Sequence, residues 1–173
     1  RGVKLADVKL ILLSHAHFDH AGGLAALKKA TGAKLVVGAG DAAAVNTGTP
    51  PGETSYGVIR FPAAKVDRAI RDGQQVTLGG VTLTAVATPG HTPGCTSWSM
   101  KLPHQGRTLD VLFACSVTVA GNKLVGNKRY PGIEADFRRS FATLGAMKAD
   151  VVLPFHPESV DLLGRVKRGA LVD

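Results

Sequence analysis

The sequence predicts an α/β fold for this chain of 173 residues. Apolar runs of strand length recur along it, beginning at residues 9–14, and apolar residues at helical spacing span 133–147. With 45% hydrophobic residues the chain can bury one core, so we expect a single domain over residues 1–173. No apolar run approaches the roughly 20 residues that a transmembrane helix needs, and we therefore expect no membrane partner.

The first strand leads directly into a cluster of polar side chains formed by His15, His17, Asp19 and His20. Imidazole nitrogens and carboxylate oxygens are ligands that zinc prefers. If the strand continues extended, His15 and His17 project to the same side and can share one ion. Asp19 and His20 break this alternation at the turn into a helix, so they can serve a second ion. The alternative is a histidine-rich surface turn, which the density of ligands disfavours.

Helical and strand patterns alternate after this cluster. A short helix beginning near residue 22 or 23 is expected to end at Gly32, since glycine is favoured just past a helix C-terminus. A strand at 34–37 and an alanine-rich helix at 41–45 follow.

A long loop is predicted at residues 46–64, where Gly, Pro and Thr are frequent. This segment is too polar for the core. Its large apolar side chains are Tyr56, Ile59 and Phe61, which can anchor a mobile surface loop or, as the family resemblance given below implies, contact a substrate.

Two hairpins are predicted next. The strands 75–78 and 81–87 flank Gly79 and Gly80, a strong turn signal. The second hairpin spans 96–114, and Trp98 within it is expected to lie in the core.

The two cysteines flank the second hairpin. Cys95 and Cys115 are equidistant from its tip near Gln105, which would make them face each other. A cross-strand disulfide is conceivable, but two buried free thiols are the expected state. His104 is expected at the exposed tip, without a functional role.

Two more histidines follow apolar strands. His91 lies between two Pro-Gly turns in the segment 88–94, directly after the strand 81–87. His156 follows a short strand at 151–153, and a last helix is expected in the tail from residue 158. Three strand ends thus present candidate metal ligands.

These motifs resemble those of the metallo-β-lactamase superfamily. The resemblance rests on the pattern His15-x-His17-x-Asp19-His20, then on Gly-His-Thr-Pro-Gly at 90–94 and a later histidine. The segments 126–131 and 137–143, ending at Phe-His-Pro, are similar to the third subclass of class B β-lactamases. The resemblance implies an αββα sandwich, of which the N-terminal strands are expected to be missing from this chain.

The resemblance also implies the roles of individual residues. It implies two zinc ions, with the ligands His15, His17 and His91 for the first and Asp19, His20 and His156 for the second.

A strand-end segment at 113–118 would lie beside these ions. It contains no Asp of the kind that bridges two metals in many related hydrolases. Ser116 and Thr118 are candidates to hold a substrate carboxylate, the alternative being ordinary strand-end hydroxyls. If the alignment shifts by one residue, Cys115 becomes a thiolate ligand instead.

The chemistry implied is hydrolysis of the β-lactam amide bond. Zinc lowers the pKa of bound water to roughly 7, so a metal-bound hydroxide is the expected nucleophile, oriented by Asp19. Such enzymes confer antibiotic resistance and are periplasmic or secreted, although this chain shows no signal peptide. The alternatives are a lactone, thioester or nucleic-acid hydrolase of the same fold, or an inactive zinc-binding fragment. The net charge of +8 is scattered along the chain, which disfavours a nucleic-acid partner.

Overall fold

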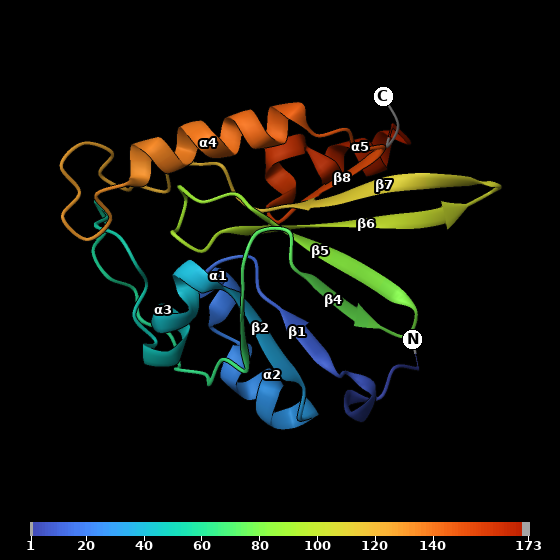
Figure 1. Cartoon of the computed structure of the whole chain (residues 1–173), viewed down its shortest axis with the longest axis horizontal. Coiled ribbons are helices and arrows are strands. Elements are labelled where there is room, and N and C mark those ends of the chain that lie inside the picture. Colours follow the sequence, from blue (N-terminus) through green and yellow to red (C-terminus); the bar gives the residue numbers. More distant parts are fainter. Residues whose placement is uncertain (1, 171–173) are drawn as a thin grey trace.

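The computed structural model describes residues 2–170, which form two facing β-sheets with helices on both outer sides (Figure 1). The first sheet is parallel, in the order β1-β2-β3, and the second has the order β4-β5-β6-β7-β8. The strands are β1 (Leu10–Leu12), β2 (Lys34–Gly38), β3 (Arg68–Ile70), β4 (Gln75–Leu78), β5 (Val81–Ala87), β6 (Thr96–His104), β7 (Arg107–Ala114) and β8 (Val151–Pro154). The predicted α/β fold is confirmed.

The helices form the two outer layers. In Figure 1, α2 lies below the first sheet and α3 to its left, and α4 and α5 lie above the second sheet. They are α1 (Phe18–Ala21), α2 (Leu24–Thr31), α3 (Ala42–Thr47), α4 (Ile133–Ala146) and α5 (Leu162–Arg168), with 3-10 turns η1 (Leu5–Asp7), η2 (Ala39–Asp41) and η3 (Pro157–Val160). Gly32 caps α2 with φ 69°, as expected for a glycine at that position. Within the described part of the chain, no helix has the length and apolarity needed to cross a bilayer.

Strand β2 shows how the first sheet holds two cores. Its residues alternate in direction, so Leu35 and Val37 pack in the cluster with α2 and α3. Val36 points the other way, into the cluster between the two sheets, where Trp98 lies. Trp98 is 2% exposed, and its ring nitrogen donates to the backbone carbonyl of Leu13 at 3.4 Å. Its predicted core position is confirmed, and it ties the second sheet to the segment that follows β1.

Most of the second sheet consists of antiparallel ribbons. The hairpins β4-β5 and β6-β7 have the predicted limits, and β8 adds to β7 in parallel. In the first sheet β1 is an edge strand that pairs only with β2, over fewer residues than predicted.

Several sequence expectations differ from the structure. The turn after His17 is a short helix, α1, and β3 was not anticipated. Phe61 and Ala64 are buried in the core cluster, so the segment 46–64 is not wholly outside the core. Phe141 in α4 is 54% exposed although its helical spacing matches the buried Phe137. A helix stripe predicts burial only where another element packs against all of it.

The expectation of two free thiols is wrong. Cys95 and Cys115 form a disulfide with a Cα–Cα distance of 6.0 Å, within the usual range for this bond. The ladder pairs Trp98 with Phe113 and ends at Ala114, beyond which the Cys115 N–H donates to the Ser97 hydroxyl at 2.9 Å. The chain leaves the regular ladder at this point, which brings the two sulfur atoms together.

Candidate metal centre and active site

The six predicted metal ligands gather at one end of the sandwich, from four segments. His15 follows β1, and α1 carries the next three ligands, with His17 at its N-terminus. His91 lies in the loop after β5, and His156 follows β8. The sequence placed these groups at strand ends, and the sheet order brings those ends together.

Three histidines form the first cluster. The Nε2 atoms of His15 and His91 lie 3.1 Å apart, and the Nδ1 atom of His17 lies 3.1 Å from the same His91 atom. Zn–N bonds of about 2.0–2.1 Å in a tetrahedron place ligand nitrogens roughly 3.3 Å apart. The observed spacing therefore fits one metal ion held by three imidazoles.

The second cluster adjoins the first. Oδ2 of Asp19 lies 3.2 Å from Nε2 of His20 and 3.4 Å from Nε2 of His156. These two imidazole nitrogens are 3.0 Å apart. His15 also comes within metal-sharing distance of Asp19 and His20, so the two clusters form one continuous centre.

Burial favours the neutral form of four imidazoles, those of His15, His17, His20 and His91. Burial lowers the pKa of His17 to about 4, and burial likewise lowers the pKa of His15, His20 and His91. A neutral imidazole offers one nitrogen lone pair to a metal. At neutral pH the cluster is ready to bind a cation rather than repel it.

Hydrogen bonds set which nitrogen faces the cluster. Nδ1 of His91 lies 2.7 Å from the backbone carbonyl of Thr118 and must donate to it, which leaves the lone pair on Nε2. His17 faces the cluster with Nδ1, and its buried Nε2 has no hydrogen-bond partner among the described residues. An N–H on that atom leaves the Nδ1 lone pair for a metal.

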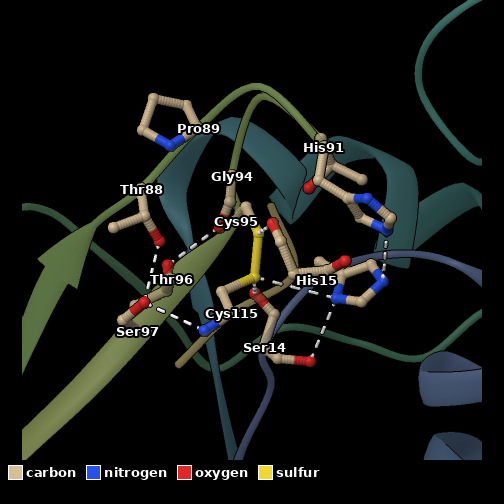
Figure 2. Close-up of a disulfide and its surroundings, with 12 residues drawn as sticks. Ser14, His15, Thr88, Pro89, His91, Gly94, Cys95, Thr96, Ser97 and Cys115 are labelled. Carbon is tan, nitrogen blue, oxygen red and sulfur yellow. Dashed lines mark hydrogen bonds between the residues drawn. A yellow bond between two sulfur atoms is a disulfide. The ribbon is translucent and has the colours of Figure 1, made fainter. Parts of the chain in front are cut away.

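The disulfide lies directly behind His15 (Figure 2). Sγ of Cys115 is 3.8 Å from Nδ1 of His15, and the Ser14 hydroxyl is 3.2 Å from the same nitrogen. Both partners lie on the side of the ring away from the Nε2 atom that faces His91. The alternative of Cys115 as a thiolate ligand is contradicted, since its sulfur is bonded to Cys95.

The polar centre opens into a cavity of about 370 Å³. One side carries Thr118 and four of the metal-ligand candidates, which are His17, Asp19, His91 and His156. The loop 46–64 supplies an apolar wall that includes Tyr56 and Ile59. Phe61 does not line the cavity and packs in the core. Ser116 does not line the cavity itself, but its hydroxyl lies 3.0 Å from that of Thr118, which does.

Some cavity residues were not predicted from the sequence. They share small or apolar side chains from two loops: Pro50, Pro51, Val58 and Ala120. Spacing offers no signal for them because their contribution depends on how the loops fold over the centre.

Asp41 was also missed. It is fully buried, and burial raises the pKa of its carboxyl group to about 6, while three hydrogen bonds to it act in the opposite direction. An acidic residue in an otherwise apolar run after a strand is the one signal that could have drawn attention to it.

A family profile of the metallo-β-lactamase superfamily matches residues 1–156. The chain belongs to this superfamily. The predicted αββα sandwich is therefore confirmed, and metal binding by the histidine cluster is what this fold implies.

Solved structures of this superfamily resemble the chain closely. The subclass B3 metallo-β-lactamase BJP-1 of Bradyrhizobium japonicum has a TM-score of 0.91 and 47% identity, covering 99% of this chain and 67% of that one. FEZ-1 from Legionella gormanii has a TM-score of 0.87 and 37% identity, covering 98% and 66%. The predicted likeness to the third subclass is confirmed. The chain spans about two thirds of the length of these proteins.

Curated relatives carry another name. Hydroxyacylglutathione hydrolase of Anaeromyxobacter dehalogenans is 35% identical over 150 residues, which are 85% of this chain and 46% of that protein. The Acidiphilium cryptum protein of the same name is 29% identical over 143 residues, with 83% and 47% covered. The chain thus spans less than half of these relatives. The shared conclusion is a metallo-hydrolase fold, and the substrate is a separate question.

Proposed function

We propose that this chain hydrolyses the amide bond of β-lactams with two zinc ions. The observation that carries the proposal is the segment 113–118, which offers hydroxyl groups beside the metal centre and no carboxylate. Asp19 is the only acidic residue that lines the cavity within the described residues. The likeness over nearly the whole chain to BJP-1, a subclass B3 metallo-β-lactamase, and to the metallo-β-lactamase FEZ-1 supports the same substrate class.

The proposed ligands divide into the two observed clusters. His15, His17 and His91 hold the first zinc, because their nitrogens converge at 3.1 Å. The second zinc is held by Asp19, His20 and His156, whose polar atoms lie within 3.4 Å of one another. Zinc bound there supplies a water of lowered pKa and a Lewis acid for the carbonyl group.

The remaining residues position the substrate. The Thr118 hydroxyl on the cavity wall, backed by that of Ser116, donates to the substrate carboxylate. Tyr56 and Ile59 on the opposite wall contact the apolar substituents of the substrate. Asp19 accepts a hydrogen bond from the attacking water and so orients it toward the carbonyl carbon.

A thioester of glutathione is the second candidate substrate. It is favoured by the names of the curated relatives, several of which align with more than four fifths of this chain. We propose that the protein is periplasmic or secreted if it is a β-lactamase. We propose no cellular location for the thioesterase function.

The test is hydrolysis by the purified, zinc-loaded chain. A chromogenic cephalosporin, a hydroxyacyl thioester of glutathione, a lactone and RNA are assayed in parallel, with and without a chelator. We expect chelator-sensitive cephalosporin hydrolysis that His91→Ala abolishes, while His104→Gln at the exposed hairpin tip leaves the rate unchanged.

Each other outcome has a definite meaning. Thioester turnover without cephalosporin turnover would replace the β-lactamase proposal by the second candidate. Bound zinc without hydrolysis of any substrate would identify the chain as an inactive zinc-binding fragment.

A further inference from the structure

The Asp41 carboxylate joins the two loops that carry the first histidine cluster. Its Oδ2 atom accepts the backbone N–H of Ala16 at 2.8 Å and the hydroxyl of Thr92 at 2.7 Å. Its Oδ1 atom accepts the backbone N–H of Gly94 at 2.7 Å. One loop follows β1 in the first sheet and the other follows β5 in the second, so a single side chain connects the two sheets at the metal centre.

Two of the three donors lie next to candidate ligands in the chain, and the third, Gly94, lies three residues after His91. Ala16 lies between His15 and His17, and Thr92 directly follows His91. Fixing the backbone at residue 16 limits the rotation of both neighbouring histidines. The carboxylate therefore acts on all three members of the first cluster without touching any of them.

The backbone around Asp41 is packed closely against the loop that carries His91. A Cβ atom on Gly38 would lie 2.1 Å from the carbonyl oxygen of Gly94, and one on Gly40 would lie 2.4 Å from that of Pro93. A Cβ atom on Gly94 would meet the Asp41 backbone nitrogen at 2.2 Å. Glycine is the residue that permits such close backbone approach. The segment 38–41 thus lies in direct backbone contact with the His91 loop and supports it.

We propose that Asp41 is a positioning residue that sets the metal affinity of the cluster formed by His15, His17 and His91. The inference rests on the metal site of the proposed function. It adds a residue outside the ligand set, which is fully buried and lies behind the loops rather than in the cavity. The cluster formed by Asp19, His20 and His156 has no bond to Asp41, so its affinity depends less on this residue.

Asp41→Asn is the sharpest variant because it preserves the shape of the side chain. An amide has one oxygen and one NH₂ group, whereas both carboxylate oxygens of Asp41 accept hydrogen bonds. Whichever way the amide is turned, its NH₂ group meets a backbone N–H that needs an acceptor. A buried unmet donor of this kind is costly and pushes at least one loop away.

The experiment measures zinc binding rather than turnover. Metal-free wild type and Asp41→Asn are titrated with zinc in competition with a chromophoric chelator, which yields a dissociation constant for each site. We expect the site formed by His15, His17 and His91 to bind zinc at least about tenfold more weakly in the variant. The affinity of the other site should change by less than about threefold.

Two control variants separate positioning from general destabilisation. Asp67→Asn removes a carboxylate that also accepts a backbone N–H, that of Leu35 at 2.7 Å, away from the cavity. Val45→Ala weakens the core cluster near α3. Both should retain wild-type zinc affinities even where their melting temperatures fall as far as that of Asp41→Asn.

Thr92 provides a matched pair should Asp41→Asn fail to fold. Thr92→Val keeps the shape and loses the bond to Asp41, while Thr92→Ser keeps the hydroxyl. We expect a weaker site in the valine variant and wild-type affinity in the serine variant.

The contrary outcomes are distinct. Unchanged affinity in a folded Asp41→Asn, or an equal loss in Val45→Ala, would overturn the role of Asp41. Absence of zinc binding by the wild type would instead overturn the metal site on which the inference rests.

Discussion

His91 is held from outside the cluster of candidate ligands, by a backbone carbonyl and by an asparagine side chain. Its Nδ1 donates to the Thr118 carbonyl at 2.7 Å, and its own carbonyl accepts from the Asn122 side chain at 3.2 Å. The Thr118 hydroxyl lies farther from Nδ1, at 3.4 Å, so the nitrogen donates chiefly to the carbonyl and the hydroxyl remains available for substrate. Thr118 thus orients His91 with its carbonyl oxygen and leaves its hydroxyl for the proposed contact with substrate.

Thr118→Val separates these tasks. Valine keeps the carbonyl that orients His91 and removes the hydroxyl proposed to hold the substrate carboxylate. A hydrogen bond to a charged group is worth about 1.5–3 kcal/mol, so we expect KM for a cephalosporin to rise roughly tenfold or more. Zinc content should stay that of wild type. Loss of zinc together with activity would show that the side chain supports the metal centre instead.

At the scale of elements, the centre depends on how closely η2 approaches the loop after β5. The glycines at 38 and 40 let the two backbones touch, as the contacts of Gly40 with Pro93 show. Local helix or strand propensity says nothing about such a contact, because it forms between segments about 50 residues apart.

Gly40→Ala tests this approach. Its Cβ atom would lie 2.4 Å from the Pro93 carbonyl oxygen, a distance that real structures do not tolerate, so η2 or the loop must move. We expect a lower melting temperature and weaker zinc binding. Gly145→Ala is the matched control: its Cβ meets nothing within 4 Å, and alanine in the exposed helix α4 should stabilise by about 0.5–1 kcal/mol. Equal behaviour of the two variants would exclude the close contact as the cause.

The disulfide is a second link between elements near the metal centre. It links residues 20 apart and closes the hairpin β6-β7 behind His15. Chain-entropy arguments for a loop of this length give about 3 kcal/mol of stabilisation.

We expect a reducing agent to lower the melting temperature of the wild type by roughly 6–12 °C. The double variant Cys95→Ala with Cys115→Ala should already melt at the lower temperature and not respond to the reductant. A wild type indifferent to complete reduction would contradict this stabilising role.

At the scale of the whole molecule, the metal-free protein carries four imidazoles whose protonation opposes folding. In the unfolded chain each has a pKa near 6.5, whereas burial lowers the pKa of His17 to about 4 in the folded chain. The pKa values of the other three, His15, His20 and His91, are also lowered by burial. Between pH 6.5 and pH 4 the unfolded chain therefore binds more protons than the folded chain does.

Stability of the metal-free chain should therefore fall as pH drops from 6.5 toward 4, with His17 alone contributing on the order of 3 kcal/mol. Asp41 acts in the opposite sense: its pKa is raised to about 6, so this group adds stability as pH falls from 6 toward 3.8. One carboxyl group does not offset four imidazoles. Thermal unfolding in a chelating buffer between pH 7.5 and 4.5 checks this.

A melting temperature that is flat or rises on acidification would contradict the assignment of neutral, buried imidazoles.

Much of the fold was predictable because it depends on local spacing. The hairpins at 75–87 and 96–114 follow from glycine turns and apolar strands, and α2 ends at Gly32 as its sequence indicates. The exposure of Phe141 was not predictable, since its spacing is that of a core residue, and its ring stacks on that of Phe137 yet stays 54% exposed.

The sequence by itself determined which side chains can bind metal, since residue type and spacing around His15, His91 and His156 carry that chemistry. It also determined the strands and turns that place them. Only the tertiary structure decided that Cys95 bonds to Cys115 and that Asp41 joins two distant loops. Those features depend on the distance between segments far apart in the chain, which sheet order and close packing set and local residue patterns do not encode.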